Sequence, residues 1–449
     1  MDRFALAKIE AWDKAEPRKP LILMGARQVG KTWLMDAFAA KHYPLDTVSI
    51  NLMQHEKLRT LFETIDLEPK VILDAISIAT HKRIEPGKTL LIIDEIQESP
   101  RALTSLKFFN EQMPELAIIV AGSLLGLALN RKKRRGKKAE EPESRASFPV
   151  GKVSFLDIGP MTFEEFLMAV GEDVKCEALR NRNWKLVSMF HDSFCELLKR
   201  YFFVGGMPEA VNAYLKRGDM MSVRSAQREI LRAYDEDFAK HADGVLLDKV
   251  RLLWRSIPAQ LAKENKKFVY TALRPGARAR EYEQALDWLD NAGMVHKVHN
   301  VSTPLLPLPG YEEFGAFKLY AHDVGLLGAM TGLSQEVLLE KNEMFTHYKG
   351  ALTEQFVAEE LSSYGIDLHY WSPDEGKAEI EFLTQIGDAL YPIEAKAEVN
   401  LQAKSLGSYI RRYNPSKALR LSMSVRDSGS KVEDYPLYSI HEMLMDLVG

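Results

Sequence analysis

A glycine-rich segment near the N-terminus has the residue types and spacing of a phosphate-binding loop. It reads Gly25-Ala26-Arg27-Gln28-Val29-Gly30-Lys31-Thr32. The glycines allow the backbone to curl so that consecutive N–H groups face a phosphate. We expect Lys31 to neutralise the β- and γ-phosphates of ATP, and Thr32 to offer its hydroxyl to Mg²⁺. All eight residues are therefore candidate nucleotide-binding residues, and Lys31 is a candidate catalytic residue as well.

Two adjacent carboxylates, Asp94 and Glu95, follow an apolar run later in the chain. The run Leu90 to Ile93 is typical of a central parallel strand buried on both faces. Carboxylates at its end would be costly without a cation. We expect Asp94 to hold the Mg²⁺ shell and Glu95 to orient or deprotonate the attacking water. An Asp-Glu pair favours ATP hydrolysis over nucleotide binding alone.

Ser123 follows the next apolar run, in the segment Gly122-Ser123-Leu124-Leu125. At the C-terminal end of a strand, its hydroxyl would lie near the γ-phosphate or the attacking water, which makes it a candidate catalytic residue. The alternative is that Ser123 caps a helix, and the residue pattern does not decide between the two roles.

These residues must be positioned by the elements around them. An apolar strand, Leu21 to Met24, precedes the glycine-rich segment and a helix follows it, which is the context that a phosphate loop needs. Up to about residue 165, short apolar runs alternate with amphipathic helices, which predicts a parallel sheet covered by helices. The further candidate strands are Val48 to Leu52, Leu90 to Ile93, Ile118 to Ala121 and Val153 to Ile158.

The middle of the chain reads as mostly helical. Residues 166–244 predict a helical lid or connector that is broken at Gly205, Gly206 and Pro208. Residues 245–345 read as two helices followed by two strands, an order that suits a winged helix. The second helix opens with Arg278-Ala279-Arg280-Glu281, which would either contact DNA or serve a module that packs on protein.

Four glutamates and a lysine stand out in a fresh α/β pattern that begins at residue 346. Helical spacing places Glu354 on an apolar face, where it either pairs with a basic group or approaches a metal. Alternation along two strands joined at Gly387-Asp388 places Glu379 and Glu381 on one face of the first strand, and Glu394 and Lys396 on one face of the second. Such carboxylates can hold Mg²⁺ or Mn²⁺ beside a lysine that supports the attacking water, but a surface salt bridge gives the same pattern.

Composition sets further bounds. A chain of 449 residues should divide into roughly two to four domains. A net charge of −4 argues against an overall basic nucleic-acid coat. No apolar run approaches the ~18 residues of a membrane span and no signal-peptide core follows Met1, so we expect a cytoplasmic protein without membrane association. Cys176 and Cys195 lack metal-site spacing and are expected to pack in helices.

One segment is strongly biased in charge. Residues 131–138 are almost all lysine and arginine, and acidic residues follow them. Blocks of like charge are usually solvated, so we expect this insert to be mobile, with a polyphosphate or nucleic-acid contact as the alternative.

Several segments together resemble the prokaryotic AAA-type ATPases that carry a C-terminal domain of unknown function. They are the phosphate loop, Asp94-Glu95-Ile96-Gln97-Glu98-Ser99-Pro100, Gly122-Ser123-Leu124-Leu125-Gly126, Pro160-Met161-Thr162-Phe163-Glu164-Glu165-Phe166, Gly205-Gly206-Met207-Pro208-Glu209 and Tyr320-Ala321-His322-Asp323-Val324-Gly325-Leu326. The likeness covers nearly the whole chain.

The resemblance implies an α/β protein with an AAA-type P-loop domain at 1–165, the helical lid at 166–244, a winged-helix-like region at 245–345 and a PD-(D/E)xK nuclease-like, restriction-endonuclease-like domain at 346–449. Matched to the nuclease pattern, the metal ligands are Glu354, Glu381 and Glu394, the catalytic lysine is Lys396, and Lys404 is a helical supplement. The sequence departs from the family at Gly151-Lys152, where Gly-Arg is common, so Arg101 and Arg145 are only candidates for a trans-acting arginine.

The leading hypothesis is a Mg²⁺-dependent ATPase whose nucleotide state controls a nuclease-like domain acting on DNA or RNA. Two alternatives stay open. One is an ATP-dependent switch whose C-terminal domain binds nucleic acid or protein without cleavage, and the other is an ATP-driven remodeller of protein partners. A homo-oligomer is compatible with all three.

Overall fold

The computed structural model describes residues 3–122, 125, 149–242, 244–335, 337, 346–373, 378–397, 404–429 and 431–448. The chain divides into two compact units. The N-terminal unit comprises Asp2–Gly159 with Asn291–Gly293, and the C-terminal unit comprises Pro160–Asp290 with Met294–Gly449. Ser123, Arg145 and the basic insert at 131–138 lie outside the described residues.

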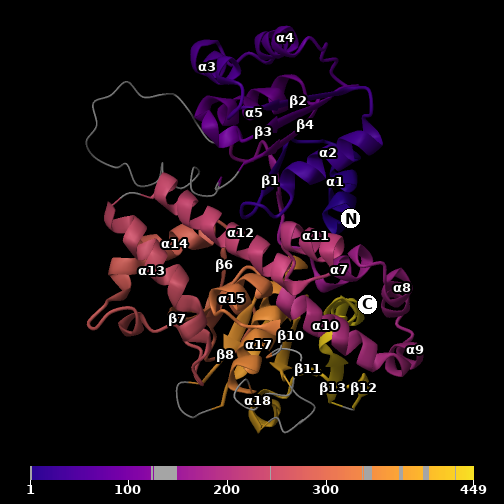
Figure 1. Cartoon of the computed structure of the whole chain (residues 1–449), viewed down its shortest axis with the longest axis vertical. Helices are drawn as coiled ribbons and strands as arrows, with labels where there is room; N and C mark the ends of the chain where they lie inside the picture. The colour runs from indigo at the N-terminus through magenta and orange to yellow at the C-terminus, as the bar shows by residue number, and fades with distance from the viewer. Residues whose placement is uncertain are drawn as a thin grey trace. The chain divides into compact units, whose positions relative to one another are not determined.

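The N-terminal unit is built on a five-stranded parallel sheet with the strand order β2-β3-β4-β1-β5 (Figure 1). Its strands are β1 (Leu21–Met24), β2 (Thr47–Asn51), β3 (Leu90–Asp94), β4 (Ala117–Ala121) and β5 (Ser154–Asp157). Its helices are α1 (Phe4–Asp13), α2 (Lys31–His42), α3 (Glu56–Thr64), α4 (Pro69–Thr80) and α5 (Pro100–Gln112). The predicted parallel sheet is confirmed, and each strand lies within one or two residues of its expected position.

The apolar runs explain this sheet. Every residue of β4 and the first four residues of β3 are buried, as expected for central strands covered on both faces. Side chains of β3 and β4 share one core cluster with residues of α3, α4 and α5. The start of α5 is set by its sequence. Ser99 caps the helix by accepting a hydrogen bond from Ala102 N, and Pro100 takes the first helical position.

The C-terminal unit combines a helical layer with an eight-stranded mixed sheet of order β12-β13-β11-β10-β9-β8-β6-β7. Its helices are α7 (Phe163–Ala169), α8 (Asp173–Arg180), α9 (Trp184–Met189), α10 (His191–Val204), α11 (Pro208–Arg217), α12 (Met220–His241), α13 (Gly244–Leu261), α14 (Ala279–Asn291), α15 (Val324–Met330), α17 (Thr346–Ser363), α18 (Lys404–Tyr413) and α19 (Ile440–Val448). Its strands are β6 (Val295–Asn300), β7 (Glu313–Ala321), β8 (His369–Trp371), β9 (Ile380–Ile386), β10 (Ala389–Ala395), β11 (Ala418–Ser422), β12 (Asp427–Ser428) and β13 (Val432–Pro436).

Helix α17 is the central helix of this unit. It contacts α15 and α19 as well as strands β6, β7 and β10. The residues from Ala351 to Leu361 are all buried, including three glutamates. Those buried carboxylates need partners inside the protein, and α17 therefore places charge as well as apolar surface at the centre of the unit.

Helices α13 and α14 are followed by the hairpin of β6 and β7, in the order expected of a winged helix. The hairpin does not stand alone, because β6 pairs in parallel with β8 through His299 and Asn300. The boundary predicted at 345–346 thus falls between strands of one sheet. Arg278 and Arg280 are exposed at the start of α14.

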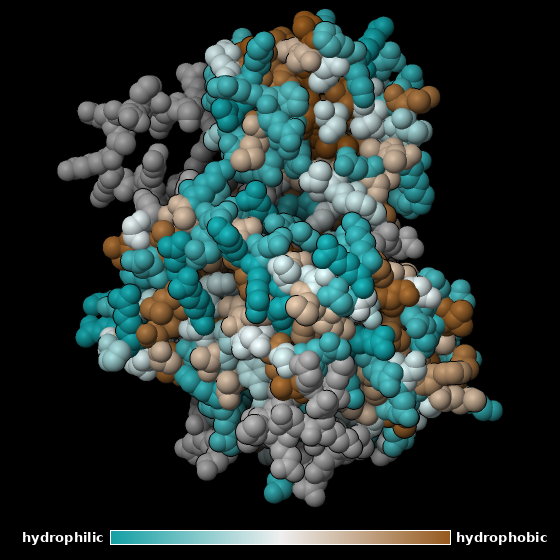
Figure 2. Space-filling view, in the orientation of Figure 1, coloured by the Kyte–Doolittle hydropathy of each residue, from teal (hydrophilic) through white to brown (hydrophobic). Residues whose placement is uncertain are grey.

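Hydrophilic side chains cover most of the face shown in Figure 2, and apolar ones lie there in small separate groups. Within the described parts of the chain, no helix is both long enough and apolar enough to cross a membrane.

Candidate nucleotide site and a buried charged cluster

The glycine-rich segment forms the turn between β1 and α2, where the sequence places it. Gly25 has φ +130°, and a Cβ added there would lie 2.1 Å from the carbonyl oxygen of Ile158. Only glycine, which has no Cβ, lets the loop backbone lie this close to Ile158. Gln28 and Gly30 also have positive φ values of 67° and 95°, so the backbone reverses several times within the loop. Alternating conformations of this kind point successive N–H groups toward an anion.

Lys31 lies inside this loop. Its side chain is almost fully buried, and its Nζ donates to the carbonyl oxygens of Gly25 at 2.9 Å and Ala26 at 2.7 Å. Burial lowers the pKa of Lys31 to about 8, although the nearby carboxylates of Glu95 and Asp94 oppose that shift. A buried ammonium that is hydrogen-bonded to neutral carbonyl oxygens is well suited to neutralise a phosphate.

Thr32 and Asp94 meet across the sheet edge. Strands β1 and β3 are separated by β4, and their carboxyl ends bring the hydroxyl of Thr32 to 3.0 Å from Oδ2 of Asp94. The backbone N–H of Glu95 donates to the other oxygen of Asp94 at 2.9 Å. Burial raises the pKa of Asp94, while these two hydrogen bonds oppose the rise. A hydroxyl and a carboxylate oxygen at this separation fit the oxygen ligands that Mg²⁺ prefers.

Glu95 is held by Gln97, which sequence reasoning left without a role. The side-chain amide of Gln97 donates to Oε2 of Glu95, and Glu95 itself has a left-handed φ of 52°. A Cβ at Gly122 would lie 2.2 Å from Oε1 of Gln97. The end of β4 therefore leaves just enough room for the amide that positions Glu95. The sequence contained a hint of this role, because Gln97 stands two residues after Glu95 in the segment Asp94-Glu95-Ile96-Gln97.

Arg3 is a second residue that sequence reasoning missed. It is buried, and its guanidinium donates to the carbonyl oxygens of Val29 at 3.0 Å and Gly159 at 2.8 Å. Arg3 thus joins the phosphate loop to the segment that follows β5. No local motif marks this role, because the partners are distant in sequence.

Of the two candidates for a trans-acting arginine, only Arg101 lies among the described residues. Arg101 donates to the carbonyl oxygens of Phe62 and Ile65, each at 2.7 Å, and so holds the end of α3 within its own unit. Arg145 and the candidate catalytic Ser123 fall outside the described residues.

Comparisons with known proteins agree with this geometry. Residues 17–167 match the family model described as an AAA domain. The N-terminal part of the chain is thus similar to AAA domains. Two further matches cover residues 195–337 and residues 349–440, and both are domains of unknown function, DUF8612 and DUF4143 respectively. The latter fits the expected C-terminal domain of unknown function, and its description names no nuclease.

The solved structures to which this chain is similar have low sequence identity to it and low TM-scores. A Walker-type ATPase of Pyrococcus abyssi is 15% identical over 74% of this chain and 95% of its own, with a TM-score of 0.45. The ORC1 protein of Aeropyrum pernix in complex with DNA is 12% identical over 73% and 90%, with a TM-score of 0.27. Cdc6p of Pyrobaculum aerophilum is 12% identical over 74% and 94%, with a TM-score of 0.28. No curated protein matches the chain.

In the C-terminal unit, Lys396 lies between two of the predicted glutamates. Its Nζ is 2.5 Å from Oε1 of Glu394 and 3.7 Å from Oε1 of Glu381. Glu394 and Glu381 lie on the paired strands β10 and β9, so the predicted ExK arrangement brings these three side chains together. Lys404 is exposed at the start of α18.

Glu354 has basic partners whose identity the sequence did not predict. Its carboxylate is 2.5 Å from Nζ of Lys266 and 3.6 Å from Nζ of Lys318, and the hydroxyl of Tyr320 donates to it at 3.2 Å. Lys318 is fully buried and also lies 2.6 Å from Glu379. Despite burial, Lys318 and Lys266 hold the pKa of Glu354 below its usual value. The pairing of Glu354 with basic groups was one of its two expected roles.

Three lysines face four glutamates in this cluster. Burial and the neighbouring carboxylates of Glu394 and Glu354 raise the pKa of Glu381 to about 8, which favours its protonated form. The other members of the cluster are Lys266, Lys318, Lys396, Glu354, Glu379 and Glu394. Among the described residues, the set whose three ligand atoms lie within 4.8 Å of one another is a different one, Glu164, His441 and Glu442.

Proposed function

We propose that this chain binds ATP with Mg²⁺ and hydrolyses it at the site formed by the loop after β1, the start of α2 and the end of β3. The observation that carries the proposal is the meeting of Thr32 with Asp94 at 3.0 Å, beside the buried ammonium of Lys31 and next to Glu95. The match of residues 17–167 to the AAA domain supports it independently.

Each residue has a distinct part in the proposed reaction. Thr32 and Asp94 would hold Mg²⁺, which supplies charge neutralisation at the phosphate oxygens when bound. Lys31 binds the β- and γ-phosphates, and the loop N–H groups orient them. Glu95, held by Gln97, accepts a proton from the attacking water or orients it. Arg3, which donates to backbone carbonyl oxygens, holds the loop in place, and Gln97 holds the side chain of Glu95 before substrate binds.

The test is ATP turnover in matched variants. Lys31→Ala should abolish nucleotide binding and turnover. Glu95→Gln should keep ATP binding but lower kcat by at least about 100-fold. Glu111→Gln, which changes a surface glutamate paired with Lys152, should behave like the wild type. Turnover that survives both Lys31→Ala and Glu95→Gln would sink the proposal.

We further propose that the nucleotide state controls a C-terminal site that acts on nucleic acid. Glu381, Glu394 and Lys396 support cleavage, because two carboxylates beside a lysine can hold Mg²⁺ or Mn²⁺ and support an attacking water. The fit is partial, because the raised pKa of Glu381 opposes its ionisation and Glu354 is held by lysines.

The pairing of Glu354 with lysines favours an alternative, in which the C-terminal unit binds nucleic acid or a protein without cleaving it. Lys266 and Lys318 neutralise Glu354 from two sides, as in a structural ion-pair network.

Cleavage assays separate the two functions. The full chain is incubated with single- and double-stranded DNA and RNA, with Mg²⁺ or Mn²⁺, and with and without ATP. Glu394→Ala is compared with Glu264→Ala, which alters an exposed glutamate outside the cluster. Metal-dependent cleavage that is lost only in Glu394→Ala supports the nuclease. If the wild type and both variants bind nucleic acid and none of them cleaves it, the alternative is supported.

A further inference from the structure

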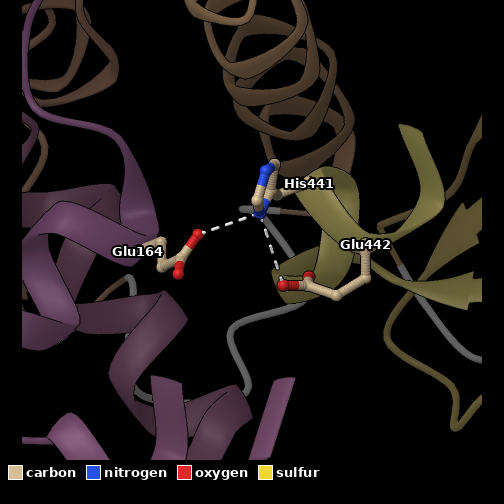
Figure 3. A group of neighbouring side chains, drawn as sticks. All are labelled: Glu164, His441 and Glu442. Atoms are coloured by element: carbon tan, nitrogen blue, oxygen red, sulfur yellow. Dashed lines mark ion pairs between the residues drawn. The ribbon is translucent and has the colours of Figure 1, made fainter. Parts of the chain in front are cut away.

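Three side chains from the two ends of the C-terminal unit converge on one point (Figure 3). Glu164 lies on α7, and His441 and Glu442 lie on α19. Nδ1 of His441 is 3.1 Å from Oε2 of Glu164 and 3.6 Å from Oε1 of Glu442. The three ligand atoms all lie within 4.8 Å of one another. The cluster is separate from the proposed nucleotide site and from the carboxylates around Lys396.

Both carboxylates are buried more than nine-tenths, with exposed fractions of 4% for Glu164 and 3% for Glu442. Oε2 of Glu164 and Oε1 of Glu442 are buried and share a single partner among the described residues, because both form ion pairs with the same imidazole nitrogen of His441. One imidazole nitrogen carries one proton, which cannot point at two carboxylate oxygens at once. A cation at the point of convergence would satisfy both oxygens and the nitrogen together.

Neighbouring groups hold these side chains in place. The ring of Tyr364 stacks on His441 with 4.9 Å between centroids, which fixes the plane of the imidazole. Arg180 binds Oε1 of Glu164, and this contact leaves Oε2 turned toward His441. The adjoining pocket is lined by Glu360, whose Oε1 accepts from Phe163 N at 2.6 Å. Ligands supported by such outer contacts are characteristic of built metal sites.

We propose that Glu164, His441 and Glu442 bind a divalent transition-metal ion, with Zn²⁺ as the best match. One imidazole nitrogen and two carboxylate oxygens form a donor set that suits Zn²⁺ and, more weakly, Mn²⁺. Mg²⁺ prefers an all-oxygen shell and should bind poorly. The ion would join α7 to α19, so that residues at the start and the end of the unit are fixed by one centre. This inference does not depend on ATP hydrolysis or on nuclease activity.

The test uses the full chain, free of tags and stripped with a chelator. Zn²⁺ is added at low micromolar concentration without nucleotide, and bound metal is counted after gel filtration. We expect one Zn²⁺ per chain and a rise in Tm of roughly 5 °C. Mn²⁺ should give a smaller rise, and Mg²⁺ at the same concentration should give none.

Three variants decide the assignment. His441→Asn and Glu442→Gln should each lose the bound Zn²⁺ and the rise in Tm. His81→Asn is the control, because His81 is an exposed histidine with a left-handed φ of 56° that asparagine tolerates. Circular dichroism of the metal-free proteins shows that each variant is folded. Should a variant not fold, X-ray absorption of the Zn²⁺-loaded wild type decides, with one imidazole and two or more oxygens expected.

Two results would overturn the proposal. One is a stripped wild type that takes up no more Zn²⁺ than one-tenth per chain. The other is stoichiometric binding that persists in both His441→Asn and Glu442→Gln, which would place the ion elsewhere on the chain.

Discussion

The hydroxyl of Thr32 donates to the carboxylate of Asp94 at 3.0 Å and so joins the phosphate loop to the acidic strand. Thr32 lies in the first turn of α2, which follows β1 through the phosphate loop, and Asp94 is the last residue of β3. Strands β1 and β3 do not pair with each other because β4 lies between them. This contact pre-positions two oxygen ligands of the kind that Mg²⁺ requires, before any nucleotide binds.

Thr32→Val should therefore damage catalysis more than its small change in shape suggests. The variant keeps the branched side chain but loses the hydroxyl, so Asp94 loses its partner and Mg²⁺ loses a ligand. We expect kcat/KM for ATP to fall at least about 100-fold, with saturation shifted to higher Mg²⁺ concentration. Thr32→Ser, which keeps the hydroxyl, should stay within a few-fold of the wild type. An unchanged Mg²⁺ dependence in Thr32→Val would contradict the assignment.

Gly122→Ala tests how Glu95 is positioned. The added Cβ would lie 2.2 Å from Oε1 of Gln97, so the amide must move and release Glu95. We expect kcat to fall about 10-fold or more while the Kd for ATP stays within a few-fold, because the phosphate loop is untouched. Steady-state turnover and equilibrium binding of a fluorescent ATP analogue measure the two quantities.

Two further variants make that test specific. Gln97→Ala should lower kcat to a similar extent, and the double variant should be no worse than either single one, because both changes remove the same contact. Gly315→Ala is the control, since a Cβ at Gly315 meets no atom within 4 Å. Additive losses in the double variant would show that Gly122 acts by another route.

The arrangement of the candidate nucleotide-site residues was largely predictable from the sequence because these residues lie in local motifs. Glycine spacing placed the loop, and an apolar run placed Asp94 and Glu95. Arg3, Lys266 and Lys318 were not predictable, since each acts on residues distant in sequence and no short pattern marks them. The same holds for the sheet of the C-terminal unit. Its continuity depends on the parallel pairing of β6 with β8, a non-local contact that periodicity cannot reveal.

Lys318→Met should strongly destabilise the C-terminal unit. Lys318 is fully buried against Glu354 and Glu379, and its removal leaves carboxylates without their compensating charge. Breaking a buried ion pair from one side typically costs about 3 to 5 kcal/mol. Urea unfolding at neutral pH measures the loss.

Matched variants separate lost charge balance from lost packing. Lys318→Met combined with Glu379→Gln should recover part of the stability, because the uncompensated charge is then removed. Lys417→Met breaks the more exposed pair with Glu433 and should cost less than about 1 kcal/mol. If the double variant is as unstable as Lys318→Met alone, the effect comes from packing.

Asp323 should make the stability of the chain fall as pH rises through mildly acidic values. Its buried carboxylate accepts hydrogen bonds from Gly206 N and Leu326 N, each at 2.7 Å, and so joins the break after α10 to the start of α15. Burial raises the pKa of Asp323 from 3.8 to about 6, although these N–H groups oppose the rise. Glu359 faces the same point, and its pKa is raised by burial and then by Asp323.

The sign follows from proton binding. Between about pH 4 and pH 6 the folded chain holds a proton on Asp323 that the unfolded chain has lost. The contribution of Asp323 is therefore full below pH 4 and is lost as pH rises to about 6, a change of roughly 3 kcal/mol. Asp323→Asn removes this titration, so the difference in unfolding free energy between wild type and variant should shrink over that window. Urea unfolding at half-unit pH steps measures it. Asp388→Asn, in an exposed turn, should show a constant difference, and a constant difference for Asp323→Asn would contradict the prediction.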